Sequence, residues 1–216
     1  MQPDLHLYED VLSNDGRQLN LPARPRMVFV THGMVTIGER AFKDGEAWSG
    51  EDAIALKAGA SGAALWRFEL TADSGTADAL AGDEETSRRK LAARLETIPR
   101  GRLLLRGDSV AFPPGGCAYL HRHQGPGIRC LYEGGIRIDT GGRSTCYGPG
   151  GAWFESGPQP VFAQAADRPT RFIRVMILPV SCLGKSSLEY VNEEDKAKPK
   201  AQQYKIFADL PLTWAG

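Results

Sequence analysis

Short apolar runs, each bounded by turn residues, recur along most of the chain. They include MVFVT from residue 27, ALWRFEL from 64, LLLR from 103, IRCLY from 128 and RFIRVMILPV from 171. Within ALWRFEL, Trp66 and Phe68 fall on one face and Arg67 on the other, which is the period of a half-buried strand. The 25 glycines and 14 prolines are spread between the runs rather than gathered in one linker. Short apolar runs separated by glycine and proline in this way predict an all-β sandwich or barrel.

One segment, residues 83–98, has the spacing of a helix instead. Leu91, Leu95 and Ile98 follow i, i+4, i+7 spacing, acidic residues suit the first turn, and Pro99 would end the helix. We therefore expect a degenerate N-terminal β unit, a connecting helix, a C-terminal barrel and a C-terminal tail, over residues 1–82, 83–100, 101–181 and 182–216 respectively.

The two strand-rich parts resemble each other in sequence. The matching segments are VTHGMVTI from Val30 with LYEGGIRI from Leu131, GEAW ending at Trp48 with GGAW ending at Trp153, and LWRFEL containing Arg67 with FIRVMI containing Arg174. Their offsets are 101, 105 and 107 residues, so the order of the matches is kept. Two similar β units explain this pattern, and shared turn chemistry on unrelated strands is the alternative.

The charges balance, with 26 basic and 26 acidic residues and no polybasic block. Neither nucleic acid nor an anionic membrane is therefore an expected partner. No apolar run is long enough to span a bilayer. The N-terminal MQPDLHLYEDVLSNDG lacks the basic start and apolar core of a signal peptide, so a cytoplasmic location is the default expectation.

The C-terminal tail changes character along its length. EYVNEEDKAKPKAQQ, from Glu189, is polar and charged, and we expect it to run over the surface or to be partly disordered. YKIFADLPL, which follows from Tyr204, is apolar enough to dock on its own domain or on a second subunit. A homodimer formed through this tail is one hypothesis.

Candidate chemistry is concentrated in the C-terminal half. His121 and His123 are separated by one residue on a predicted strand, so both side chains project to the same side and can share one ion. Neutral imidazole is the commonest metal ligand. A structural pair of hydrogen-bonded imidazoles without an ion is the alternative.

Two segments around this pair resemble the cupin motifs. FPPGGCAYLHRHQGPGIRCLYEGG from Phe112 is similar to the first motif, G-x5-H-x-H-x3–4-E-x6-G, and GGRSTCYGPGGAWFE from Gly141 is similar to the second. The positions that match are Gly115, His121, His123, Gly134, Pro149 and Gly151. The resemblance implies a cupin-type double-stranded β-helix, or jelly-roll, barrel, and the internal repeat makes the chain bicupin-like. The family includes metal-dependent oxygenases, isomerases and lyases as well as proteins that only bind or store, so the fold leaves function open.

The chain departs from the ligand set of that family at two positions. The family's glutamate falls at Gly127 or Ile128, and its third histidine falls at Phe154 or Val161. None of these four side chains binds metals. The resemblance therefore supports the fold better than it supports the usual metal site.

Other residues could complete a site around the histidines. Glu155 would give a two-histidine, one-carboxylate set for iron, manganese, nickel or zinc, with Gln124 as a weaker ligand; the alternative for Glu155 is a carboxylate in solvent. Arg129 should face the same interior and pair with Glu155 or with an anionic substrate, the alternative being a rim arginine paired with a surface acid. Tyr119 shares the histidine face and is expected to line the pocket.

Two functions follow from these expectations. The first is a small-molecule enzyme of oxygenase, isomerase or lyase type, in which a divalent metal on His121 and His123 acts on a small anionic or chelating substrate. The second is a non-catalytic module that binds a small acid or sugar without a metal, and the missing ligands favour it. A structural role through the tail is a third.

Overall fold

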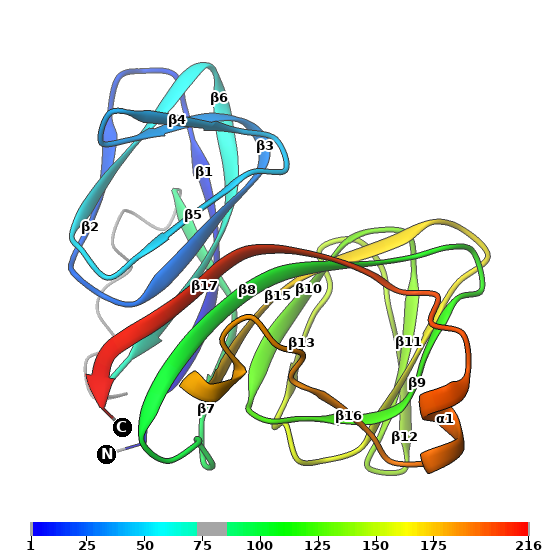
Figure 1. The fold of residues 1–216 in the computed structure, drawn as a ribbon. Coiled ribbons are helices and arrows are strands. Elements are labelled where there is room, and N and C mark those ends of the chain that lie inside the picture. The colour runs from blue at the N-terminus through cyan, green and yellow to red at the C-terminus, as the bar shows by residue number, and fades with distance from the viewer. Residues whose placement is uncertain (1, 73–85, 216) are drawn as a thin grey trace. The chain divides into compact units, whose positions relative to one another are not determined.

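The structure is a computed structural model that describes residues 2–72 and 86–215. The chain forms two compact units, Met1–Glu96 (unit 1) and Thr97–Gly216 (unit 2), and almost every element in them is a strand (Figure 1). The described residues contain no helix that is long and apolar enough to cross a membrane.

Unit 1 consists of seven strands: β1 (Asp4–Leu12), β2 (Gln18–Leu21), β3 (Arg26–Ile37), β4 (Arg40–Lys43), β5 (Ala47–Gly50), β6 (Ile54–Thr71) and β7 (Ser87–Arg94). Unit 2 consists of β8 (Arg102–Phe112), β9 (Cys117–His123), β10 (Gly127–Glu133), β11 (Ile136–Thr140), β12 (Arg143–Tyr147), β13 (Ala152–Glu155), β14 (Val161–Ala165), β15 (Thr170–Pro179), the 3-10 helix η1 (Val180–Cys182), β16 (Leu188–Tyr190), α1 (Glu193–Ala197) and β17 (Gln203–Ala215).

Unit 2 is built from two antiparallel sheets. One has the order β13-β10-β15-β8-β17 and the other has the order β12-β11-β14-β9-β16. Buried apolar side chains from both sheets form one cluster, in which Phe112 and Phe172 of the first sheet pack with Ile138 and Ala163 of the second. The core of unit 2 therefore lies between its two sheets.

Unit 1 repeats this strand order in a single seven-stranded sheet. The first sheet of unit 2 corresponds to the pairing order β5-β3-β6-β1-β7 in unit 1. The pairing order β12-β11-β14-β9 of the second sheet corresponds to β4-β3-β6-β2. The long strands β3 and β6 each take the places of two strands of unit 2. The sequence resemblance between the two halves thus corresponds to a shared order of strand pairing.

A glycine bends the chain at the same place in each unit. Gly33 in β3 and Gly134 between β10 and β11 have φ of +79° and +87°, values that favour glycine. A β-carbon at Gly33 would lie 2.3 Å from the carbonyl oxygen of Gly62, and one at Gly134 would lie 2.4 Å from that of Pro169. Since neither site has room for a side chain, the two bends have the same steric cause.

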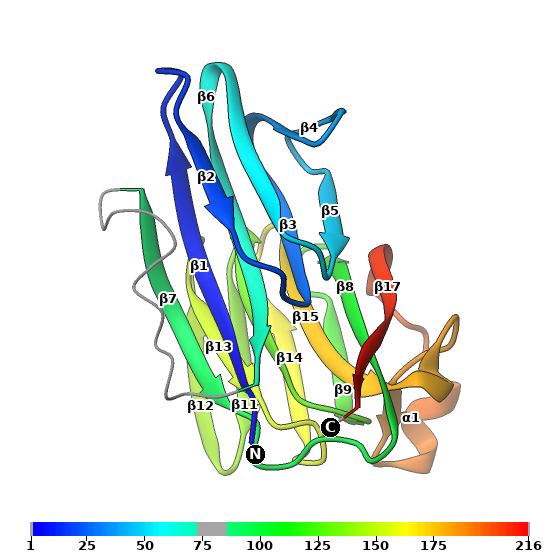
Figure 2. The same cartoon turned by 90° about the vertical axis from the view of Figure 1, so that its left-hand side faces the viewer.

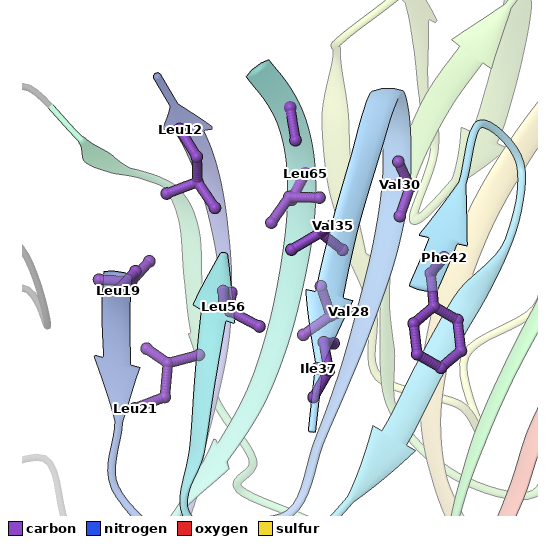
Figure 3. Close-up of a cluster of buried hydrophobic side chains, with 11 residues drawn as sticks. Leu12, Leu19, Leu21, Val28, Val30, Val35, Ile37, Phe42, Leu56 and Leu65 are labelled. Atoms are coloured by element: carbon purple, nitrogen blue, oxygen red, sulfur yellow. The ribbon is translucent and has the colours of Figure 1, made fainter. Parts of the chain in front are cut away.

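The interior of unit 1 contains a cluster of apolar, mostly aliphatic side chains (Figure 3). Its cluster consists of Leu12, Leu19, Leu21, Val28, Val30, Val35, Ile37, Phe42, Leu56, Ala63 and Leu65. Burial of this apolar surface is the main stabilising contribution that this interior makes.

The structure contradicts the predicted helix over residues 86–98. The first three residues of the prediction, 83–85, lie outside the described residues. Residues Ser87–Arg94 form β7, an edge strand that pairs with β1 (Figure 2). Arg88 and Lys90 pair with Glu9 at 2.6 and 3.4 Å. Charges opposite one another on neighbouring strands stabilise the pairing, and basic residues suit an exposed edge. These tertiary contacts outweigh the helical spacing.

The strand ALWRFEL, which the alternation predicted to be half-buried, is buried on both faces. Arg67 forms two hydrogen bonds to Asp10, at 2.7 and 3.0 Å, and contacts Glu69 at 2.9 Å. Arg26 donates to the other oxygen of Glu69 at 2.8 Å. Because each charge has a partner of opposite sign, the polar face tolerates burial.

The C-terminal tail docks on its own unit rather than standing apart as a separate segment. β17 runs beside β8 (Figure 1), and β16 pairs with β9. Both strands extend the sheets of unit 2, which is the first of the two docking alternatives expected for this tail. A homodimer through the tail stays a prediction.

We expect Arg67→Met to lower the free energy of unfolding by about 3–5 kcal/mol, because it leaves the buried carboxylate of Asp10 without its cation. Urea unfolding followed by circular dichroism measures the loss. Arg40→Met removes an exposed arginine and should change stability by about 0.5 kcal/mol or less. Equal losses in the two variants would contradict the importance of the buried pair.

Candidate functional site

The two histidines of β9 lie inside unit 2. His121 and His123 are each 5% exposed and line the same cavity. Their ring centroids are 4.8 Å apart and the rings are nearly perpendicular, at 82°. The expected same-side placement of the two imidazoles is therefore what the structure shows.

The hydrogen bonding of the two rings differs. Nδ1 of His121 lies 2.7 Å from the carbonyl oxygen of Tyr119, which can only accept, so Nδ1 carries the proton and Nε2 is left with a lone pair. Nδ1 of His123 is buried and has no hydrogen-bond partner among the described residues. Its Nε2 lies 3.7 Å from Oε2 of Glu155. His123 thus has hydrogen-bonding capacity that the described side chains leave unused.

Arg129 and Glu155 form an ion pair beside the histidines. Nη2 of Arg129 lies 2.8 Å from Oε2 of Glu155, and the two groups form an ion pair. The geometry between these two atoms is not that of a hydrogen bond. Nη1 of Arg129 donates to the carbonyl oxygen of Gly127 at 2.7 Å. Trp153 Nε1 donates to Oε1 of Glu155 at 2.8 Å. Arg129 is 1% exposed, so it is the interior arginine paired with Glu155 rather than the rim arginine.

A second buried ion pair lies next to the first. Arg174 of β15 is opposite Arg129 of β10 in the register of the sheet, and it forms two hydrogen bonds with Asp108 of β8, at 2.7 and 3.0 Å. The sequence analysis assigned neither Arg174 nor Asp108 to the site. The arginine inside the apolar run RFIRVMILPV was the available indication, because a buried guanidinium needs a carboxylate partner.

Burial dominates the electrostatics of these groups. It lowers the pKa of His121, against the attraction of Glu155. Burial, followed by repulsion from Arg174 and Arg129, lowers the pKa of His123 well below its ordinary value. Burial also lowers the pKa of Arg129 to about 10, against the attraction of Glu155. At neutral pH both imidazoles are therefore neutral while both guanidinium groups stay charged.

The space between these side chains is small. The cavity has a volume of about 20 Å³, close to what one water molecule requires. Apolar and aromatic side chains complete its wall, among them Leu188 of β16 and Tyr204 of β17. The two strands of the docked tail therefore form part of the wall, which the sequence analysis did not predict.

Tyr119 and Gln124, both expected in the pocket, lie outside it. The partners of His121 and Ala118 on β14 are two positions apart, whereas His121 and Ala118 themselves are three positions apart on β9. This bulge breaks the alternation, so Ala118 rather than Tyr119 shares the interior with the histidines. Gln124 follows the end of β9, is exposed, and accepts a hydrogen bond from Cys182 Sγ at 3.4 Å.

Among its described residues, unit 1 has no equivalent of this site. By strand register, Leu21 takes the place of His121, Val28 that of Arg129, and Gly50 that of Glu155. Two of these side chains belong to the apolar cluster of unit 1. The candidate chemistry is therefore confined to unit 2.

Comparison with known proteins links this architecture to solved structures. No family model and no curated protein matches the chain. A variant of oxalate decarboxylase from Bacillus subtilis has a TM-score of 0.60 at 12% identity, covering 90% of this chain and 73% of that one. A variant of salicylate 1,2-dioxygenase from Pseudoaminobacter salicylatoxidans has a TM-score of 0.55 at 10% identity, covering 95% of this chain and 75% of that one. A cupin 2 conserved barrel domain protein from Leptotrichia buccalis has a TM-score of 0.50 at 10% identity, covering 82% of this chain and 84% of that one.

The chain has a cupin fold. This confirms the fold that the two sequence motifs indicated. At these identities the likeness to cupin structures shows the fold alone, and function has to be argued from the residues of the site.

A divalent metal, which the resemblance to cupins implies, does not fit the residues present. Among the described residues, no group of three or more His, Cys, Asp or Glu side chains is arranged to hold a metal ion. Oε2 of Glu155 is paired with Arg129, and Oε1 accepts from Trp153. A dication would also face the guanidinium groups of Arg129 and Arg174, which repel it in a medium of low dielectric constant.

The lowered histidine pKa values predict a loss of stability in acid. The unfolded chain takes up protons as the pH falls below about 6.5, whereas the folded protein keeps both imidazoles neutral, so the free energy of unfolding falls with pH in that range. The slope is up to about 1.4 kcal/mol per pH unit for each histidine that stays neutral. Urea unfolding between about pH 7 and pH 5 measures it.

His123→Gln should make this pH dependence shallower, because a glutamine takes up no proton in either the folded or the unfolded state. The assignment is wrong if His123→Gln and the unsubstituted protein lose stability with the same slope.

Proposed function

We propose that unit 2 is a metal-free cupin module that binds a small carboxylic acid in the cavity between its sheets. The observation that carries this proposal is the fully buried guanidinium of Arg129, which lines the same cavity as two neutral imidazoles. A guanidinium recognises a carboxylate through paired, charge-assisted hydrogen bonds, and burial strengthens them.

The hydrogen-bonding groups of the cavity suit the protonated form of a carboxylic acid. Arg129 supplies only donors, and Nε2 of His121 supplies an acceptor. One oxygen of the acid would accept from Arg129, while its hydroxyl would donate to His121. The same arrangement results if a carboxylate binds and His121 takes up a proton.

Charge balance favours this uptake of a proton. Arg129 and Arg174 carry two positive charges, and Glu155 and Asp108 carry two negative ones. The interior is therefore neutral when the imidazoles are neutral. A bound carboxylate adds one negative charge, which is costly in a closed site unless a proton accompanies it. Binding should strengthen as the pH falls.

The size of the cavity limits the ligand or requires a side chain to move. A space of about 20 Å³ does not hold a whole carboxylic acid. Tyr204, at the wall, is 48% exposed, and its ring lies 5.7 Å from the guanidinium carbon of Arg174. Rotation of this partly exposed ring would open the cavity beside the arginines without disturbing the sheets.

The neighbours in the structure comparison support the same ligand class. Two of them are named for their action on oxalate and on salicylate, and both compounds are carboxylates. These names also favour the second candidate, a cupin enzyme with a bound metal. We place that candidate second because Arg129 already neutralises the carboxylate that the metal would need.

Isothermal titration calorimetry with formate, acetate, oxalate and salicylate tests the proposal. At least one acid should bind the untagged protein, and Arg129→Met should weaken that binding by about 10-fold to 100-fold, as expected for loss of a charge-assisted hydrogen bond. Affinity should rise by up to about tenfold for each unit that the pH is lowered, with one proton taken up.

Arg122→Ala is the matched control, because Arg122 lies on β9 between the two histidines but is exposed. It should bind the acid as the unsubstituted protein does. The proposal fails if none of the four acids binds, or if Arg129→Met and Arg122→Ala bind equally well.

A further inference from the structure

The cavity of unit 2 contains a cation that belongs to the chain itself. The guanidinium of Arg129 lies against the carboxylate of Glu155 and the carbonyl oxygen of Gly127, at 2.8 and 2.7 Å. His121 and His123 line the same small space. A positive charge, a carboxylate and two imidazole rings are thus already brought together.

A glycine lies beside this guanidinium and accepts a hydrogen bond from it. A β-carbon at Gly127 would lie 3.0 Å from Nη1 of Arg129 and 2.5 Å from the carbonyl oxygen of Val175. Position 127 therefore has no room for a side chain, and the backbone of β15 excludes one even apart from the arginine. Gly127 and Glu155 are directly opposite in the register of β10 and β13. The carboxylate of the site comes from β13, and the guanidinium fills the space over β10.

Removal of the guanidinium would leave two imidazoles and an unpaired carboxylate around the vacated space, and these are groups that metals bind, although in the present structure they are not arranged as a metal site. Glu155 would keep only the hydrogen bond from Trp153, and its buried negative charge would need a new partner. Nε2 of His123 lies 3.7 Å from Oε2 of Glu155, near the distance of about 3.3 Å between two ligand atoms on one tetrahedral ion. Nε2 of His121 carries the lone pair that a third ligand requires.

We propose that Arg129 acts as the built-in cation of this cavity and keeps divalent metals out, so that replacing it by a neutral residue creates a metal site from His121, His123 and Glu155. The role is electrostatic and steric: the guanidinium neutralises Glu155 and occupies the space of the ion. It goes beyond the proposed function, because it concerns metal affinity and does not depend on whether the cavity binds an acid.

Titration with Co²⁺, followed by its visible absorption, and with Zn²⁺, followed by calorimetry, tests the proposal on untagged protein. The unsubstituted protein should bind less than about 0.1 equivalents of either ion, and Arg129→Met should bind about one, with the absorption of cobalt in a low-coordinate nitrogen and oxygen site. Arg129→Lys keeps the positive charge and should bind neither ion.

Two further variants locate the new site. Arg129→Met combined with Glu155→Gln, and Arg129→Met combined with His123→Ala, should each lose the bound ion. Because Arg129→Met leaves a buried carboxylate unpaired, its folding is checked by circular dichroism without metal and with Zn²⁺. Arg129→Gln, whose amide can still donate to Glu155, is the second neutral variant and should bind the ions more weakly than Arg129→Met.

The proposal is overturned if the unsubstituted protein binds about one equivalent through its histidines. It is also overturned if the folded neutral variants bind no more metal than Arg129→Lys, or if metal bound by Arg129→Met survives both double substitutions. If none of the four carboxylic acids bound the unsubstituted protein, the proposed function would be refuted, but these outcomes for metal binding would be unchanged.

Discussion

A guanidinium buried in the interior of a β unit requires a carboxylate beside it, and this requirement organises the polar interior of the protein. In unit 1, Arg67 of β6 is paired with Asp10 of β1, and in unit 2, Arg174 of β15 is paired with Asp108 of β8. The strands correspond in the two sheets. A charged pair between these two strands is therefore common to both units, although Asp108 lies directly opposite Arg174 and Asp10 lies two residues beyond the position opposite Arg67. Removing one partner leaves an uncompensated charge, which costs more than the pair itself contributes.

Unit 2 adds a further pair, and this addition sets the chemistry of its cavity. Arg129 and Glu155 are neutralised by each other, so the two guanidinium groups and the two carboxylates together carry no net charge. The imidazoles lose their protons in this environment because burial and the arginines oppose a further positive charge. The result is a closed polar space that resists a metal cation and presents both hydrogen-bond donors and an acceptor.

Much of the fold could be predicted from the sequence, because apolar runs and glycine turns reflect short-range constraints. The bend at Gly134 and the matching bend at Gly33 are visible as corresponding residues of two similar segments. The error at residues 83–98 has a long-range cause. Arg88 and Lys90 are stabilised in a strand by Glu9, which lies far away in the chain, and helical spacing carries no information about that contact.

The site was predictable only in part, for the same reason. His121, His123, Arg129 and Glu155 could be placed near one another from strand alternation and motif spacing. Tyr119 could not be placed, because a bulge in β9 depends on pairing with β14. Nor did spacing indicate that strands of the tail would complete the wall of the cavity.

The central claim is that two neutral imidazoles lie beside a buried, paired guanidinium. Nitrogen-15 NMR of the histidine rings and arginine side chains at neutral pH tests it most directly. The account predicts that His121 is neutral with its proton on Nδ1, that His123 is neutral, and that the guanidinium protons of Arg129 exchange slowly with solvent. Protonated imidazoles at neutral pH, or fast exchange at Arg129, would contradict it.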